Sequence, residues 1–150
     1  MHPYAKFGWM IVTSTAVMLG LMYLNTFQLG HVYFSETRAF MALIMGATMA
    51  VIMLAFMLGM YKDRARNVWI MAGSVAVFAI ALWLVRSQVT VDDVAYMKAM
   101  IPHHSIAVLT SKRAHIADPR VRKLADGIIA AQLREIDEMK ALIADIERGR

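Results

Sequence analysis

Residues 39–61 read AFMALIMGATMAVIMLAFMLGMY and contain no charged side chain. A helix needs about 20 residues to cross a hydrocarbon core of about 30 Å, so this stretch is long enough to span a membrane. Inside lipid the backbone must satisfy its own hydrogen bonds, and a helix does so within one segment. The stretch therefore predicts a transmembrane helix.

Two further apolar stretches flank this one. Residues 7–30 contain no charge, and neither do residues 68–85. We expect three transmembrane helices, at about 7–30, 39–61 and 68–85. The first stretch is longer than the apolar core of a signal peptide, and Asn25-Thr26-Phe27-Gln28 closes it without a small-residue cleavage site. We therefore expect an uncleaved anchor.

Apolar and charged residues separate along the chain of 150 residues. Apolar residues make up 59% of the chain and are concentrated in the first 85 positions, whereas charged residues are concentrated in the rest. This predicts a membrane domain at 1–86 and a polar domain at 87–150. From Gln88 onward there are ten Lys and Arg against nine Asp and Glu, and this balance argues against nucleic-acid binding. The absence of cysteine excludes disulfides and thiolate metal sites.

Basic residues near the span ends predict the orientation in the membrane. Lys6 precedes the first span, and three more lie between the second and the third: Lys62, Arg64 and Arg66. The first loop carries only Arg38, and Arg86 follows the third span. By the positive-inside rule, the N-terminus and the second loop face the cytoplasm. We expect a bacterial inner (cytoplasmic) membrane, with the polar domain in the periplasm or outside the cell.

The polar domain has the pattern of two helices, at about 91–114 and 119–147. Asp118-Pro119 is typical of a helix start, with Asp as the N-cap and Pro at the first helical position. Because the linker between the helices is short, we expect an antiparallel helical hairpin and an all-α chain. Pro102 lies inside the first helix, where it would kink that helix or split it in two.

Thioether and imidazole side chains gather on one face of the first polar helix: Met97, Met100, His103 and His104. The second helix places an amide, a carboxylate and a thioether at matching spacings: Gln132, Glu135 and Met139. On grounds of ligand softness, thioether sulfur together with imidazole nitrogen favours Cu(I) or Ag(I). Imidazole together with carboxylate would instead accommodate Cu(II) or zinc. The plain alternative is that one histidine is partly buried and the other solvated, and that Met100 and Met139 only fill the core.

Two motifs stand in this region: Met100-Ile-Pro-His103-His104-Ser-Ile-Ala107 and Gln132-Leu-Arg-Glu135-Ile136-Asp-Glu-Met139. They match the patterns Met-x-x-His-His-x-x-Ala and Gln-x-x-Glu-Ile-x-x-Met, so residues 92–146 resemble the family catalogued as domain of unknown function 305. The resemblance implies a ferritin-like helical bundle, and some family members bind copper or silver in the periplasm and support metal resistance. The resemblance implies that the first candidate ligands are His103, His104, Met100 and Met139, and that Met97 comes next. Gln132 and Glu135 are then alternative ligands or groups that hold the ligands.

The His-His unit occurs once in this chain, whereas soluble members of that family generally carry it twice. A two-helix unit of about 60 residues also buries little surface by itself. Both points predict that a second copy completes a four-helix bundle, which makes a homodimer or higher homo-oligomer the expected state. Packing of the hairpin against another subunit is the alternative.

The expected function is membrane-anchored capture or buffering of copper or silver, or resistance to these metals, without catalysis. Its partners would be the lipid bilayer, further copies of the chain and a metal donor or acceptor protein. The alternative is a structural or accessory subunit of a membrane complex, with the hairpin as a docking element. An enzyme is not expected, because the chain has no Glu-x-x-His pair, nucleophile–base set or phosphate loop.

The remaining features of the sequence favour structural roles over metal transport. Methionine recurs every fourth residue along the second span, at 41, 45, 49, 53 and 57, but such a row winds around a helix, so we expect packing. No acidic or histidine residue lies within a span, so the usual mark of an ion path is missing. His31 in the first loop is expected to be an interfacial residue.

Overall fold

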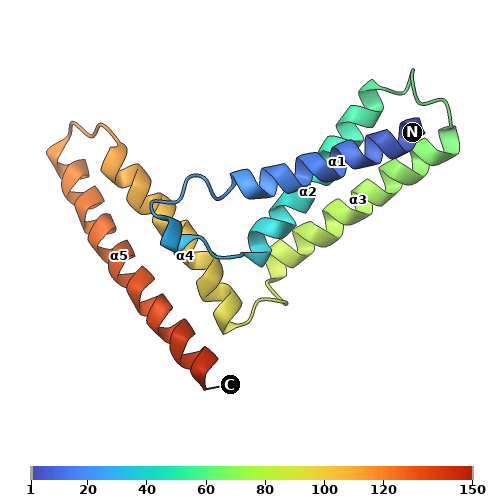
Figure 1. Ribbon diagram of the computed structural model, residues 1–150. Helices are drawn as coiled ribbons and strands as arrows, with labels where there is room; N and C mark the ends of the chain where they lie inside the picture. Colours follow the sequence, from blue (N-terminus) through green and yellow to red (C-terminus); the bar gives the residue numbers. More distant parts are fainter. Residues whose placement is uncertain (1, 150) are drawn as a thin grey trace. The chain divides into compact units, whose positions relative to one another are not determined.

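A computed structural model describes residues 2–149 (Figure 1). Its helices, in chain order, are α1 Pro3–Leu21, the 3-10 helix η1 Leu29–His31, α2 Glu36–Phe56, α3 Arg64–Ser87, α4 Asp93–Arg113 and α5 Pro119–Arg148. Residues 2–149 contain no strand, which confirms the all-α prediction. The predicted domain limits at residues 1 and 150 lie outside the described range.

The three apolar helices agree with the predicted spans in number and order. α1, α2 and α3 contain 19, 21 and 24 residues, and each is long and apolar enough to cross a membrane. The α3 helix is capped at its start by Asp63, whose carboxylate accepts a hydrogen bond from the backbone N–H of Arg66 at 3.1 Å. Three membrane-spanning candidates followed by two polar helices are thus the architecture of the described chain.

The first helix ends at Leu21, earlier than the predicted limit of residue 30. The Arg38 guanidinium donates a hydrogen bond to the backbone oxygen of Met22 at 2.7 Å, which satisfies a carbonyl at the helix end. A turn follows, in which the backbone N–H of Thr26 bonds to the oxygen of Tyr23 at 3.4 Å. The apolar residues beyond this turn therefore leave the helix instead of extending it.

The described chain divides into two compact units. We call residues 2–22 and 37–90 the membrane unit, and residues 23–36 and 91–149 the polar unit. The sequence predicts one boundary, between residues 86 and 87, with the first loop inside the membrane domain. The structure groups that loop with α4 and α5 instead, because η1 packs against α4.

Small residues let the helices of the membrane unit approach closely. Ala42, Gly46, Ala47 and Ala50 are buried along α2. A Cβ added to Gly46 would lie 2.2 Å from the hydroxyl oxygen of Thr15, so any larger residue there would have to displace the Thr15 side chain. The methionine row winds as expected. Met41 and Met45 are exposed, whereas Met53 and Met57 pack against a buried cluster that contains Leu54.

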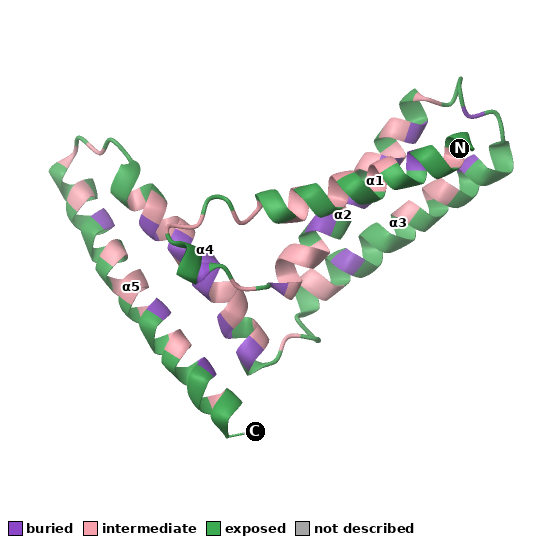
Figure 2. Cartoon of the chain, viewed as in Figure 1, coloured by how far each residue is buried: buried purple, intermediate pink, exposed green. Residues whose placement is uncertain are grey.

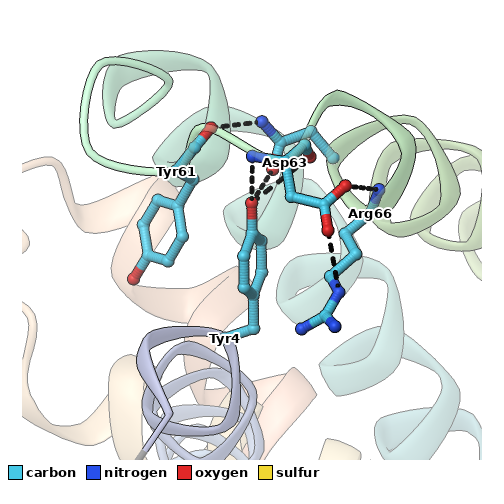
Figure 3. A network of polar contacts seen from close by, with 5 residues as sticks. Tyr4, Tyr61, Asp63 and Arg66 are labelled. Carbon is cyan, nitrogen blue, oxygen red and sulfur yellow. Dashed lines mark hydrogen bonds and ion pairs between the residues drawn. The ribbon is translucent and has the colours of Figure 1, made fainter.

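A polar network at one end of the membrane unit joins the start of α1 to the start of α3 (Figure 3). The Tyr4 hydroxyl accepts a hydrogen bond from the backbone N–H of Asp63 at 3.1 Å and donates to Oδ1 of Asn67 at 3.0 Å. Asn67 in turn donates to the backbone oxygen of Tyr61 at 2.6 Å. Asp63 forms an ion pair with Arg66 at 3.0 Å. These bonds satisfy the polar groups that the loop between α2 and α3 brings together.

In the polar unit, α4 and α5 lie side by side and run in opposite directions (Figure 1). The buried positions of α4 recur at spacings of three and four: Val94, Met97, Ile101, Ser105 and Val108. Along α5, Figure 2 shows buried positions recurring on a mostly exposed helix, and these are Ala125, Ile136 and Ile143. Pro102 is buried inside α4, which remains one helix and is not split.

Candidate metal centre

The α4 helix presents the candidate ligands on consecutive turns. Its N-cap is Asp92, whose carboxylate accepts a hydrogen bond from the backbone N–H of Ala95 at 2.8 Å. An acidic cap is favoured by the positive end of the helix dipole. Met100, His103 and His104 follow in the regular helix at spacings of three and four residues, so their side chains leave the same side of α4.

The imidazole of His104 is held through both of its nitrogens. Its side chain is only 12% exposed. Nδ1 lies 3.0 Å from the backbone oxygen of Met100, and because a carbonyl only accepts, this nitrogen carries the proton. Nε2 lies 2.8 Å from Oε2 of Glu135 on α5. In the neutral ring, the nitrogen with a lone pair for a metal ion therefore faces a carboxylate of the neighbouring helix.

This pair sets up a competition between a proton and a metal ion. An ionised carboxylate only accepts hydrogen bonds, so Nε2 of His104 must carry a proton, or Glu135 must, for the 2.8 Å contact to be a hydrogen bond. A metal ion that binds Nε2 would displace this proton. The Glu135 oxygen would then become a ligand or a charge partner of the ion.

His103 and Met100 lie beside this pair. The His103 ring stands edge-on to the ring of His104, with the ring centroids 6.1 Å apart and the planes at 64°. His103 is exposed and Met100 is half-buried. An exposed imidazole loses little packing when it changes rotamer, so His103 can turn toward an ion held at His104.

Met97 and Met139 occupy a different environment. Met97 is buried at 7% exposure in a hydrophobic cluster that includes Ile101 and Ile136. Met139 is half-buried and packs against the same cluster. Both thioethers therefore fill the core between α4 and α5, a packing role that methionine commonly serves. Gln132 is half-buried on α5, one turn before Glu135.

Among the predicted residues, the structure thus pairs His104 with Glu135, places the ring of His103 beside that of His104, and leaves two methionines in the core. Within residues 2–149, no three His, Asp or Glu side chains converge as a metal-holding group. The closest donor set is imidazole with carboxylate, a combination that fits Cu(II) or zinc. Cu(I) or Ag(I) would draw on the thioether of Met100, which shares the side of α4 with both imidazoles.

A buried contact next to His104 comes from the first loop. The Ser105 hydroxyl oxygen accepts a hydrogen bond from the backbone N–H of Phe27 at 2.7 Å and lies 3.0 Å from Nδ1 of His31. Ser105 is fully buried and His31 is 4% exposed. Tyr33 packs against the α4–α5 cluster, so the loop covers one side of α4.

The environment of His31 favours its neutral form. Burial lowers the pKa of His31 below 6.5, the nearby Lys140 lowers it further, and Asp137 opposes this shift. Since the Ser105 oxygen already accepts from Phe27, its O–H can donate to Nδ1 of His31. A neutral ring with its proton on Nε2 accepts that bond.

The sequence contains a signal for this contact. Ser105 is a hydroxyl residue at an otherwise apolar position of the α4 core stripe, and a buried hydroxyl requires a hydrogen-bond partner. The sequence predicts only an interfacial His31, because no local pattern identifies the partner across a separation of 74 positions.

Comparison with known proteins gives a family for the polar helices. Residues 89–149 match the model of the family described as "Domain of unknown function (DUF305)". The chain is similar to "Uncharacterized protein L153" of Acanthamoeba polyphaga mimivirus, with 38% identity over 72 residues that cover 47% of each protein. The chain thus spans about half the length of this curated relative. No solved structure matches the chain.

Proposed function

We propose, from the match of residues 89–149 to the DUF305 family model, that the chain captures or buffers copper or silver ions at a membrane surface. The observation that carries the proposal is the pairing of His104 Nε2 with Glu135 Oε2 at 2.8 Å, beside the exposed ring of His103. This arrangement offers nitrogen and oxygen donors at one point between two helices, as metal sites in helical bundles do. The chain would act by reversible ligation, without catalysis.

The choice of metal depends on which donors join His104. Met100 can add a thioether from the same side of α4, which favours Cu(I) or Ag(I). Met139 can join them only if its side chain leaves the cluster around Ile136. Glu135 instead favours Cu(II) or zinc. We propose Cu(I) or Ag(I) as the cargo, with Glu135 as the charge partner of the site.

We place the metal centre outside the cytoplasm, in a bacterial inner membrane with the N-terminus inside. The basic residues around the loop between α2 and α3 support this orientation. Residues 23–36 belong to the same compact unit as α4 and α5, which agrees with a chain whose first loop and last domain lie on one side of the membrane.

The polar unit is proposed to be half of a ferritin-like four-helix bundle that a second copy completes. Only three of the 30 positions of α5 are buried, so one α4–α5 pair leaves most of this helix exposed. A second copy would cover more of its surface and bring a second His103–His104 pair into the assembly. A metal donor or acceptor protein would be a further, transient partner.

The alternative function is that of a structural or accessory subunit, with α4 and α5 as a docking element. The exposed apolar side chains of α5 favour this reading, since Leu124 is 65% exposed and Val121 is 48% exposed. Under this alternative, removing the imidazoles would leave both assembly and cellular metal tolerance intact.

A tolerance assay in cells tests the proposed function. Cells that express the full chain are compared with cells that express a variant with both His103→Ala and His104→Ala, at matched amounts in the membrane fraction. His115→Ala is the control, because this histidine is exposed and lies beyond the end of α4. We expect the wild-type and control chains to raise copper or silver tolerance and the double variant to lose the gain. A double variant that protects as well as the wild type would contradict the proposal.

A further inference from the structure

An open apolar groove runs along the membrane unit and has a volume of about 620 Å³. All three helices of the unit line it. α2 contributes the buried Ala42, Gly46 and Ala50. By contrast, α1 and α3 contribute exposed side chains such as Val12 and Trp69. α2 therefore forms the floor of the groove, and α1 and α3 form its rims.

The length of the groove corresponds to one leaflet of a bilayer. Its lining covers positions 11–19 of α1, 39–50 of α2 and 69–77 of α3. At a rise of about 1.5 Å per residue, these stretches are about 12–16 Å long. Half of a hydrocarbon core of about 30 Å is about 15 Å. An acyl chain of one leaflet therefore fits along the groove, whereas a transmembrane helix of a partner would extend far beyond it.

The lining is apolar apart from two hydroxyl groups and the indole N–H of Trp69. The hydroxyls belong to Thr15 and Ser74, and that of Thr15 already donates to the backbone oxygen of Ile11 at 2.8 Å. Because α1, α2 and α3 are membrane-span candidates, the medium around the groove is hydrocarbon instead of water. An apolar chain is the occupant that fits, since it supplies the packing contacts that an empty groove lacks.

One end of the groove leads to Arg66 and Tyr4. Arg66 precedes Gly73 by seven positions, so it lies on the face of α3 that lines the groove. Tyr4 precedes Thr15 by eleven positions and lies on the corresponding face of α1. The guanidinium carbon of Arg66 lies 5.4 Å from the centre of the Tyr4 ring. The two lining faces therefore meet at this cation and this ring.

The Arg66 guanidinium has donors without a partner in the chain. Its Nε pairs with Oδ2 of Asp63 at 3.0 Å. Within residues 2–149, neither terminal nitrogen of Arg66 forms a hydrogen bond or an ion pair, and both lie on the side of the guanidinium away from that carboxylate (Figure 3). The terminal nitrogens of arginine form a planar fork that binds phosphate oxygens in pairs. Arg66 can therefore bind a phosphate without giving up Asp63.

Positive charge is in excess at this end of the membrane unit. Lys6, Lys62 and Arg64 are exposed, and none of them forms an ion pair in the described part of the chain. Asp63 is the only acidic residue in the sequence of the membrane unit. Basic residues at a membrane surface attract anionic lipids, and basic pockets between transmembrane helices bind their headgroups. The charge therefore favours an anionic headgroup beside Arg66.

We propose that the groove holds an acyl chain of an anionic phospholipid, whose phosphate binds the terminal nitrogens of Arg66. The Tyr4 ring supports the guanidinium from one face. Trp69 follows Arg66 by three positions and lies at the depth where tryptophan commonly meets the headgroup region. This lipid site belongs to the membrane unit alone and does not depend on the metal centre of the proposed function.

Lipid titration of the purified full chain, in a nonionic detergent with chelator, tests the headgroup. Phosphatidylglycerol should raise the melting temperature as it binds, and phosphatidylcholine with the same acyl chains should bind at least about tenfold more weakly. Arg66→Gln should weaken phosphatidylglycerol binding by about tenfold or more, because it removes a charge-assisted bond to the phosphate. Arg64→Gln is the matched control. It removes the same charge from an exposed position and should change the affinity by less than about fivefold.

Filling the groove tests the position of the acyl chain. A Cβ at Gly73 meets nothing within 4 Å, so Gly73→Leu extends into open space. It should weaken lipid binding by about tenfold, because it displaces methylene groups from the groove. Ala16→Leu, from the wall on α1, should have the same effect. Ala79→Leu is the control, since Ala79 is exposed and lies about 120° around α3 from Gly73.

Four results would overturn the proposal. Phosphatidylglycerol might leave the melting temperature of the wild type unchanged, or Arg64→Gln and Arg66→Gln might weaken binding equally, which would show attraction to general charge. Glycerol phosphate that competed as well as the whole lipid would show that the groove plays no part. A change in oligomeric state in Gly73→Leu and Ala16→Leu, with lipid affinity intact, would identify a second copy as the occupant.

Discussion

Nε2 of His104 lies 2.8 Å from Oε2 of Glu135, a residue 31 positions further along the chain and on the neighbouring helix. The contact joins α4 to α5 at the point where the His-His unit and the Gln-x-x-Glu motif meet. It also fixes which nitrogen of His104 remains for a metal ion, since Nδ1 is occupied by the backbone oxygen of Met100.

The first prediction concerns this carboxylate. Glu135→Gln keeps the size of the side chain but removes the negative charge beside Nε2 of His104. We expect metal affinity to fall by about ten- to a hundredfold, as when a group that holds a metal-bound histidine is lost. Competition titration against a chromophoric chelator measures the change.

Glu147→Gln is the control for that titration. Glu147 also bridges the two helices, through a 2.7 Å ion pair with Lys98, but it is distant in sequence from the imidazoles. Its loss should leave metal affinity unchanged. An equal effect of both substitutions would mean that general packing, and no specific role of Glu135, determines the affinity.

The second prediction concerns the contact between the first loop and α4. Ser105→Ala would leave the Phe27 N–H and His31 Nδ1 without their partner, at a cost of about 1–3 kcal/mol. Hydrogen exchange of residues 27–33 should become faster. Thr110→Ala should not change it, because the Thr110 hydroxyl bonds only to carbonyls of its own helix. Unchanged exchange in Ser105→Ala would show that the loop does not depend on this hydroxyl.

The third prediction concerns pH. The pKa of His31 in the folded protein is below 6.5, mainly because of burial, with Lys140 contributing and Asp137 opposing. The unfolded chain therefore binds the proton at a higher pH than the folded chain. The stability associated with neutral His31 is present above pH 6.5 and is lost as pH falls from there through the lowered pKa.

Thermal melting in chelator at several pH values measures this effect. The melting temperature of the wild type should drop as pH falls below about 6.5, and His31→Asn should flatten the drop. His115→Asn, a change at an exposed histidine, should leave the wild-type pH dependence in place. A His31→Asn variant with the same pH dependence as the wild type would rule out His31 as its source.

The fourth prediction concerns the membrane unit. Gly46→Ala places a methyl group where Oγ1 of Thr15 lies, and this hydroxyl is held by a 2.8 Å hydrogen bond to the Ile11 oxygen. We expect a loss of about 1–3 kcal/mol in stability from overpacking, measured by thermal unfolding in detergent. Gly73→Ala is the matched control, since a Cβ there meets nothing within 4 Å. Combining Gly46→Ala with Thr15→Ala should recover most of the loss.

Much of this fold could be predicted because its determinants are local. The apolar stretches identify the three spans, and Asp118 followed by Pro119 marks the start of α5 where the structure has it. The end of α1 could not be predicted in this way. Hydropathy counts Phe27 and Leu29 as membrane residues, but the turn at Tyr23 and the Arg38 bond to Met22 lead them out of the helix.

The candidate site was predictable in its residue types and less so in its geometry. Helical spacing brings Met100, His103 and His104 to one side of α4, and the structure agrees with that arrangement. Spacing does not specify how α5 is rotated against α4. That rotation pairs Glu135 with His104 and packs the half-buried Met139 against the core. The contact of His31 with Ser105 depends on a loop that joins the polar unit, a tertiary feature without a local pattern.

The most direct test of the metal centre is a titration of the purified chain with Cu(I) and Ag(I), repeated on the variant with both His103→Ala and His104→Ala. We expect saturable binding by the wild type and a loss of about a hundredfold or more in affinity when both imidazoles are removed. Undiminished binding by the double variant would contradict the proposed site, and an absence of binding by the wild type would contradict the proposed function.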